Sequence, residues 1–109
     1  MHRGMLDRRV QIQRATMADD GYSSVEEWGD AGPVLWASRK DASDGERFQS
    51  QMSLSELMTR FVVRSDDFTR TISSDDRLVT EGRTFHVLGV KELGRNDWLE
   101  ITASAQSDQ

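Results

Sequence analysis

The 109-residue sequence has no cysteine, one proline and two histidines. The lack of cysteine excludes disulfides and thiolate metal sites, and His2 and His86 are too few and too far apart to suggest a metal site alone. No apolar run approaches the roughly 20 residues that a membrane span requires, and the opening MHRGMLDRR lacks the apolar core of a secretory signal. We therefore expect a soluble protein, made in a reducing compartment, with no membrane contact.

Apolar residues are also scarce, at 36% of the chain against 30% charged residues. This composition suits one domain, residues 1–109, with a modest core. The net charge of −5 argues against binding of nucleic acid through a basic surface. The charge is uneven, because residues 1–14 hold four arginines and one aspartate, whereas residues 15–30 hold five acidic residues and no basic one. Two interpretations stay open: two solvated faces, or complementary patches that meet between copies of the chain.

No pattern typical of catalysis is present. Adjacent aspartates at 19–20, 66–67 and 75–76 do not form carboxylate pairs, since neighbours in a strand point to opposite faces and such pairs in turns are hydrated. His86 lies between Phe85 and Val87 on the opposite face, so we expect it on the surface or in an interface. No glycine-rich phosphate-binding loop occurs. We expect no enzyme activity, no catalytic residue, no cofactor and no metal.

The three tryptophans, Trp28, Trp36 and Trp98, are of the type that stacks on bases in nucleic-acid-binding barrels. Basic residues are not interleaved around them in the sequence. We therefore expect them to pack in the core or in a subunit interface.

Alternating apolar residues predict strands. RRVQIQR (8–14) alternates Val10 and Ile12 with glutamines, residues 34–37 and 59–65 are apolar or β-branched, and residues 77–90 read as two strands around a Glu81-Gly82 turn. A further turn at 94–96 precedes an alternating strand. Residues 15–24 are expected as a turn or exposed loop, with a break at Gly32-Pro33 and a flexible tail at 104–109. Five or six short strands predict a mainly β fold, a small antiparallel β-barrel or sandwich.

Residues 41–58, DASDGERFQSQMSLSELM, are the least strand-like part of the chain. Ser43 followed three residues later by Glu46 fits a capping box, so a short helix is expected to start there. The apolar residues of this segment do not share one face. We expect a long loop with a short helix that is mobile or is ordered only by neighbours.

Several short motifs follow one another along nearly the whole chain. The first motif, G-x-L-x-x-R-V-x-I-Q-R, spans residues 4–14. It is followed by an acidic glycine turn, two tryptophans and a Gly-Glu pair. The last motif, R-L…G-R-x-F-x-V-x-x-V, spans residues 77–90. The matching residues after the first motif are Asp20, Gly21, Trp28, Trp36, Ala37, Gly45, Glu46, Arg77, Leu78, Gly82, Arg83, Phe85, Val87 and Val90. This ordered series resembles the head–tail joining (head-completion, or stopper) proteins of long-tailed bacteriophages and of phage-like particles such as gene transfer agents.

The resemblance implies a structural protein at the head–tail interface of a virion or phage-like particle, assembled in the bacterial cytoplasm. Its copies would form a cyclic ring beneath the portal or adaptor ring. That ring would close the DNA-filled head and dock the tail terminator or tail proteins below. Packaged double-stranded DNA would pass through the channel without sequence-specific binding.

By the same resemblance, residues 41–58 would be the channel or inter-subunit loop. Its candidate contact residues are Glu46, Arg47, Phe48, Gln51, Met52 and Leu54. Contacts with the next copy or with the adaptor would involve the basic start and the acidic segment that follows it. The candidates are Arg8, Arg9, Arg14, Asp19 and Asp20.

Two alternatives remain at this point. A tail terminator, or another tail-assembly ring protein, would share the β-rich content and the ring. A nucleic-acid-binding β-barrel would need salt-sensitive affinity for single strands, which the net charge of −5 disfavours.

Overall fold

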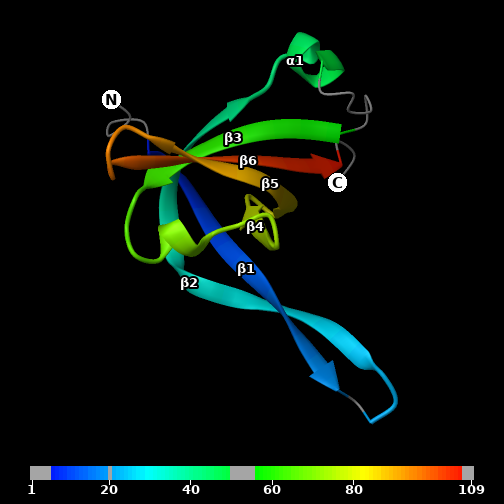
Figure 1. The fold of residues 1–109 in the computed structure, drawn as a ribbon. Coiled ribbons are helices and arrows are strands. Elements are labelled where there is room, and N and C mark those ends of the chain that lie inside the picture. Colours follow the sequence, from blue (N-terminus) through cyan, green and yellow to red (C-terminus); the bar gives the residue numbers. More distant parts are fainter. Residues whose placement is uncertain (1–5, 20, 50–55, 107–109) are drawn as a thin grey trace.

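The computed structural model describes residues 6–19, 21–49 and 56–106 (Figure 1). Its strands are antiparallel and close into a barrel in the order β1-β2-β3-β6-β5-β4, with β4 paired to β1. The elements are β1 (Arg8–Asp19), β2 (Ser24–Asp41), α1 (Asp44–Gln49), β3 (Glu56–Arg64), the 3-10 turn η2 (Thr69–Thr71), β4 (Asp76–Thr80), β5 (Arg83–Leu93) and β6 (Trp98–Gln106). The predicted mainly β fold, a small antiparallel barrel, is confirmed.

The core lies inside the barrel and is made by alternate residues of its strands. Val10 and Ile12 of β1 are fully buried, as the alternation predicts. Phe61 of β3 and Phe85 of β5 meet edge to face at its centre, with ring centroids 5.3 Å apart. His86, the neighbour of Phe85, is exposed, which confirms its expected surface position.

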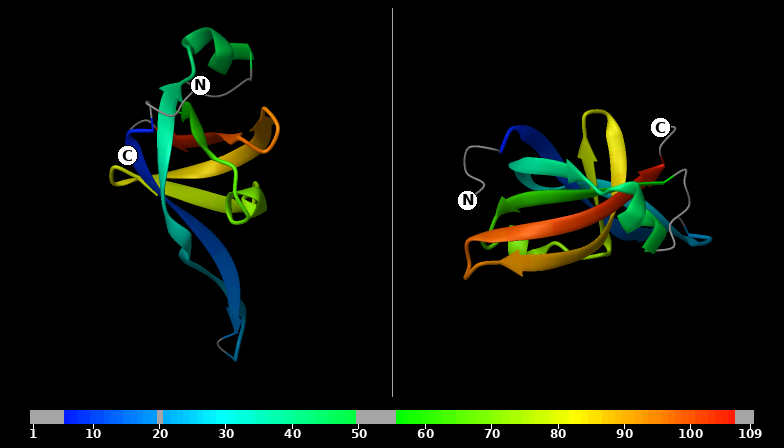
Figure 2. Two further views of the ribbon diagram at one scale, coloured as in Figure 1. Left: turned by 90° about the vertical axis from the view of Figure 1, so that its left-hand side faces the viewer. Right: turned by 90° about the horizontal axis from the view of Figure 1, so that it is seen from above.

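The first hairpin extends far beyond the barrel, which corrects the sequence interpretation. Residues 15–24 were expected as a turn or loop, yet β1 continues to Asp19 and β2 begins at Ser24. Because β1 pairs with β4 only over Gln11–Arg14, the following residues pair with β2 alone. The result is a two-stranded projection, residues 15–30, which we call the arm (Figures 1 and 2).

The expected break at Gly32-Pro33 is a register irregularity inside β2. Val10 pairs with Leu35, but Ile12 pairs with Ala31, so the extra residues of β2 bulge between these two positions. Gln11 Nε2 donates hydrogen bonds to the carbonyl oxygens of Ala31 (3.3 Å) and Gly32 (3.2 Å). The bulge accommodates the proline without ending the strand.

The later hairpins follow the predicted turns. Glu81 and Gly82 have φ angles of +53° and +77° between β4 and β5, and Gly94 and Asn96 have positive φ angles between β5 and β6. The expected tail, residues 104–109, overlaps β6, which runs to Gln106 because Ala105 still points into the core. Residues 107–109 lie outside the described residues. In the described part of the chain, no helix is long and apolar enough to cross a membrane.

Candidate assembly surfaces

Helix α1 stands away from the barrel between β2 and β3 and is tied to it at two points. Ser43 Oγ accepts a hydrogen bond from the Glu46 backbone N–H at 3.2 Å, which confirms the predicted helix start. The Glu46 carboxylate binds Arg60 of β3 at 2.7 Å. The Ala42 N–H donates to the Met58 carbonyl at 2.7 Å, so backbone hydrogen bonds connect β2 and β3 up to the start of the helix.

The six candidate loop residues are thus only partly described. Glu46, Arg47 and Phe48 lie in α1, where Arg47 also pairs with Asp44 at 3.2 Å. Gln51, Met52 and Leu54 lie outside the described residues. Their role as channel or interface residues stays a prediction.

The three basic candidates of β1 have three different environments. Arg8 forms an ion pair with Glu81 of the β4–β5 turn at 3.1 Å. The Arg9 guanidinium lies over the ring of Trp36 at 4.5 Å. Arg14 binds Asp76 of β4. The role of these three arginines in contacts with another copy or with the adaptor stays a prediction.

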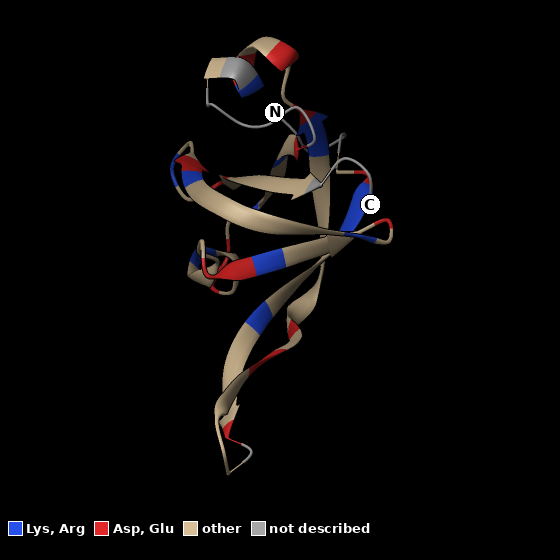
Figure 3. Cartoon of the chain, turned by 90° about the vertical axis from the view of Figure 1, so that its right-hand side faces the viewer, with Lys and Arg blue, Asp and Glu red and all other residues tan. Residues whose placement is uncertain are grey.

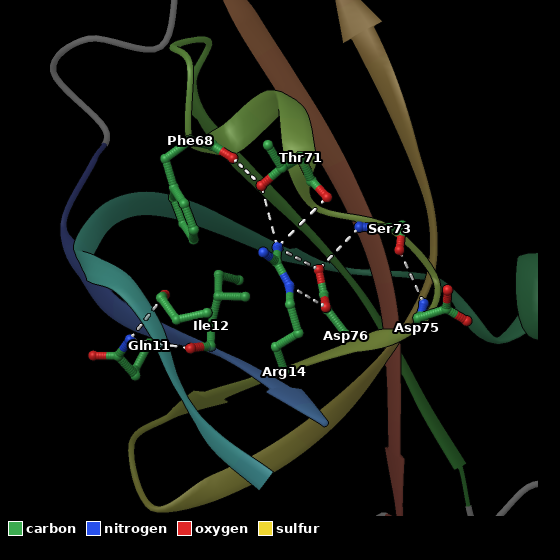
Figure 4. A network of polar contacts seen from close by, with 9 residues as sticks. Gln11, Ile12, Arg14, Phe68, Thr71, Ser73, Asp75 and Asp76 are labelled. Carbon is green, nitrogen blue, oxygen red and sulfur yellow. Dashed lines mark hydrogen bonds and ion pairs between the residues drawn. The ribbon is translucent and has the colours of Figure 1, made fainter. Parts of the chain in front are cut away.

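Arg14 and Asp76 form the strongest polar contact at the base of the arm (Figure 4). Arg14 Nε and Nη2 donate to the two carboxylate oxygens of Asp76 at 2.9 and 3.1 Å, and Nη2 also donates to Thr71 Oγ1 at 3.2 Å. The hydrogen bond to Asp76 raises the pKa of Arg14 above its ordinary value, against partial desolvation, which lowers it. Asp76 is almost fully buried and also accepts a hydrogen bond from the Ser73 N–H.

Phe68 also packs at the base of the arm. Its ring occupies the space over Gly32, whose φ angle is +69°, so that a Cβ at position 32 would overlap the ring. The Arg14 guanidinium lies 5.7 Å from the same ring. Phe68 and Asp76 therefore fix the arm to the barrel, and sequence reasoning missed both. For Phe68, the available sequence signal was Gly32 beside the only proline, which indicates an unusual backbone at this position. For Asp76 there was no such signal, because the sequence Asp75-Asp76 does not show which of the two aspartates is buried.

An arginine guanidinium lies over the ring of each tryptophan, although no basic residues are interleaved around the tryptophans in the sequence. Arg77 lies over Trp28 at 4.3 Å, and Arg64 lies over Trp98 at 5.5 Å, besides Arg9 over Trp36. None of the three rings is fully buried, so the expectation of core packing is wrong. The arginines come from other strands than the tryptophans, which the linear order does not reveal. Packing in a subunit interface stays a prediction.

The arm carries the whole net charge of the protein. Its five acidic residues equal the net charge of −5, because the other 14 acidic residues match the 14 lysines and arginines. Figure 3 shows acidic positions along this projection. Asp20 lies outside the described residues. Among the residues that the structure describes, no acidic residue of the arm pairs with a basic one, and no cluster could hold a metal ion.

Comparison with known proteins identifies the family. A family profile described as phage head completion protein matches residues 1–106. The chain belongs to this family. It is therefore a structural head-completion protein of a virion, and it contacts other head and tail components there.

Solved structures share the fold of this head-completion protein. The solution structure of protein SF1141 from Shigella flexneri 2a is 24% identical, with a TM-score of 0.75 and full coverage of both chains. A chain from the virion of a native gene transfer agent particle is 22% identical, with a TM-score of 0.69, and the match covers 92% of this chain and 94% of that one. No curated protein matches the sequence.

Proposed function

We propose that copies of this head-completion protein form a ring beneath the portal or adaptor ring, where they close the DNA-filled head and dock the tail. The observation that carries this proposal is the presence of two projections on opposite sides of one barrel (Figures 1 and 2). In a head-to-tail ring that also closes its bore, one surface of each subunit faces the channel and another contacts a neighbour. The α1 segment fits the first role and the arm fits the second.

In this ring, residues 41–58 face the channel. The described charges of α1 are internally paired: Arg47 binds Asp44, and Glu46 binds Arg60. A segment with paired charges offers few free cations to phosphates, so DNA held behind it slides out without sequence-specific binding. Several such segments would block the bore sterically, and a modest rearrangement would reopen it.

The proposed role is purely structural, without catalysis or a cofactor. Arg8 and Arg9 face the acidic arm of the next copy, including Asp19 and Asp20, or the adaptor above. Arg14, whose side chain stays 40% exposed while it is bound to Asp76, is the third basic candidate for that contact.

Electron microscopy of particles made after deletion of the gene tests this function. We expect separate tails beside heads that have packaged DNA and then lost it, and addition of the purified protein should restore joined particles. Normally joined particles without the protein would contradict the proposal. Filled, stable heads beside tails of irregular length would contradict it too, and would indicate a tail terminator.

A further inference from the structure

The barrel carries an apolar groove at the end of β1 opposite to the arm. Its volume is about 480 Å³, and it is lined by Leu6, Val34, Leu35, Trp36 and Val63, with Arg64 and Asp66 at the polar rim. Val34 and Trp36 are half exposed, at 45% and 52%. A solvent-facing groove with such side chains is typical of a docking surface.

Two arginines and one aspartate border the groove, and the aspartate, Asp66, accepts a hydrogen bond from the Thr69 N–H at 2.7 Å. Arg64 lines it directly, and Arg9 lies over the Trp36 ring. In the described part of the chain, neither arginine forms an ion pair with an acidic residue. The groove therefore combines an apolar floor with cations that are available to an acidic partner.

The arm has the complementary properties. Met17, Tyr22 and Val25 expose 66%, 98% and 45% of their surface. The described acidic residues of the arm form no ion pair with a described basic residue. Among the described residues of the arm, the backbones of β1 and β2 pair only with each other, and an isolated two-stranded hairpin is marginally stable in water. Such an arm gains order when another surface covers it.

The groove and the arm of one molecule cannot meet. Trp36, in the groove, pairs with Arg9, and the arm ends at the pair Asp19 and Ser24. Ten residues of strand separate Arg9 from Asp19, a distance of about 33 Å at 3.3 Å per residue. The Phe68 and Asp76 contacts hold the arm pointing away from the barrel (Figure 4). The occupant of the groove must come from another molecule.

We propose that the arm of one copy lies in the apolar groove of the next copy, with its carboxylates against Arg9 and Arg64. This contact is head-to-tail, because each copy uses two different surfaces, and a closing rotation turns it into a ring. The inference rests on the proposed ring and identifies the surfaces that join its subunits.

Thiol cross-linking in assembled particles tests this contact, since the chain has no cysteine of its own. The test variant combines Val25→Cys in the arm with Val34→Cys in the groove, both at half-exposed positions. The matched control combines Val25→Cys with Leu88→Cys, which is equally exposed on β5 and outside the groove. Particles made with each variant are treated with a short bis-maleimide and separated under denaturing conditions.

We expect the test variant to give a ladder at multiples of 12.4 kDa, and the control and the single variants to give no ladder. Joined particles without a ladder would overturn the contact and leave the head-completion function intact. A cross-link from Val25→Cys to a different virion protein would overturn it as well, because the arm would then dock elsewhere. If neither variant yields joined particles, circular dichroism of the purified proteins shows whether each variant is folded, and the cross-linking is repeated on the folded proteins at high concentration. A ladder from Val25→Cys with Val34→Cys alone then supports the contact, and equal results from the test and control variants overturn it.

Discussion

The contact between Arg14 and Asp76 shows how a polar pair orients a projection. Asp76 is almost completely buried, whereas the Arg14 side chain is 40% exposed. A buried carboxylate is costly unless cations and N–H groups satisfy it. Arg14 from β1 and the Ser73 N–H do this, so the pair connects the base of the arm to the loop that precedes β4.

Asp76→Asn should lower the free energy of unfolding by about 2 kcal/mol, because the substitution removes the negative charge and replaces one of the two oxygens that accept from Arg14 with an NH2 donor. Urea denaturation measures the change. The control is Asp75→Asn, whose carboxylate is exposed, and it should change stability by less than about 0.5 kcal/mol. Equal effects of the two substitutions would mean that the buried pair does not stabilise the fold.

The pH dependence of this contribution has a defined sign. The pKa of Arg14 is raised in the folded state, so its stabilisation is complete below the ordinary arginine pKa and disappears only as pH rises through the folded value. The stability difference between the wild type and Asp76→Asn should therefore stay constant from about pH 7 to about pH 10. Urea titrations across this range check the expectation, and a difference that shrinks toward pH 10 would contradict it.

Gly32→Ala should destabilise the protein by at least about 1–2 kcal/mol, because alanine is strained at positive φ and its Cβ would displace Phe68. Gly29→Ala is the matched control in the same strand, where no atom lies within 4 Å of the added Cβ. It should be neutral or slightly stabilising. Thermal unfolding of both variants provides the comparison, and tolerance of alanine at position 32 would argue against the Phe68 contact.

Helix α1 depends on the barrel as well as on its own sequence. The capping motif predicts where it starts, but a helix of six residues is too short to be stable alone. The carboxylate of Glu46, which a capping box would direct to Ser43, instead binds Arg60. Local sequence thus determines the start of the helix, and a tertiary ion pair holds it in position.

Glu46→Gln should increase hydrogen exchange of the α1 amides on the order of two- to five-fold, in line with a partly exposed ion pair. Glu100→Gln is the control, because Glu100 contacts the same Arg60 at the longer distance of 3.9 Å and lies in β6, outside the helix. Mass spectrometry measures the hydrogen exchange of the α1 amides in both variants and in the wild type. Unchanged exchange in Glu46→Gln would show that the ion pair does not hold α1.

The elements with clear alternation could be predicted from the sequence, and the arm could not. Val10, Ile12, Phe85 and Val87 mark buried faces, and positive φ at Gly82 fits its turn. The arm has no buried face, so its strands lack the alternation that identifies a strand, and only backbone pairing defines them. Pairs such as Arg14 with Asp76 join residues 62 positions apart, which no local pattern indicates.

The distribution of charge and apolar surface explains why a net-acidic barrel would assemble with its own copies. The arm contributes all of the net charge, and the basic start lies at the other end of β1. In the proposed head-to-tail ring, successive copies would bring these two regions together.

Reversal of the basic start, Arg8→Glu with Arg9→Glu, should reduce the yield of joined particles by about ten-fold or more, because like charges would then meet the acidic arm. Lys91→Glu with Arg95→Glu makes the same charge change at exposed positions on the β5–β6 hairpin and should leave the yield near that of the wild type. Particle counts by electron microscopy measure both. Equal yields from the two double variants would exclude the charge pairing.

The central claim, a ring whose subunits are joined by arm and groove, is tested most directly by a cryo-electron-microscopy reconstruction of the head–tail junction in the native particle. We expect copies of the barrel to surround the bore, with each arm in the apolar groove of its neighbour and each α1 segment facing the channel. Barrels that surround the bore with empty grooves, or arms that contact only the portal side or the tail, would contradict the account.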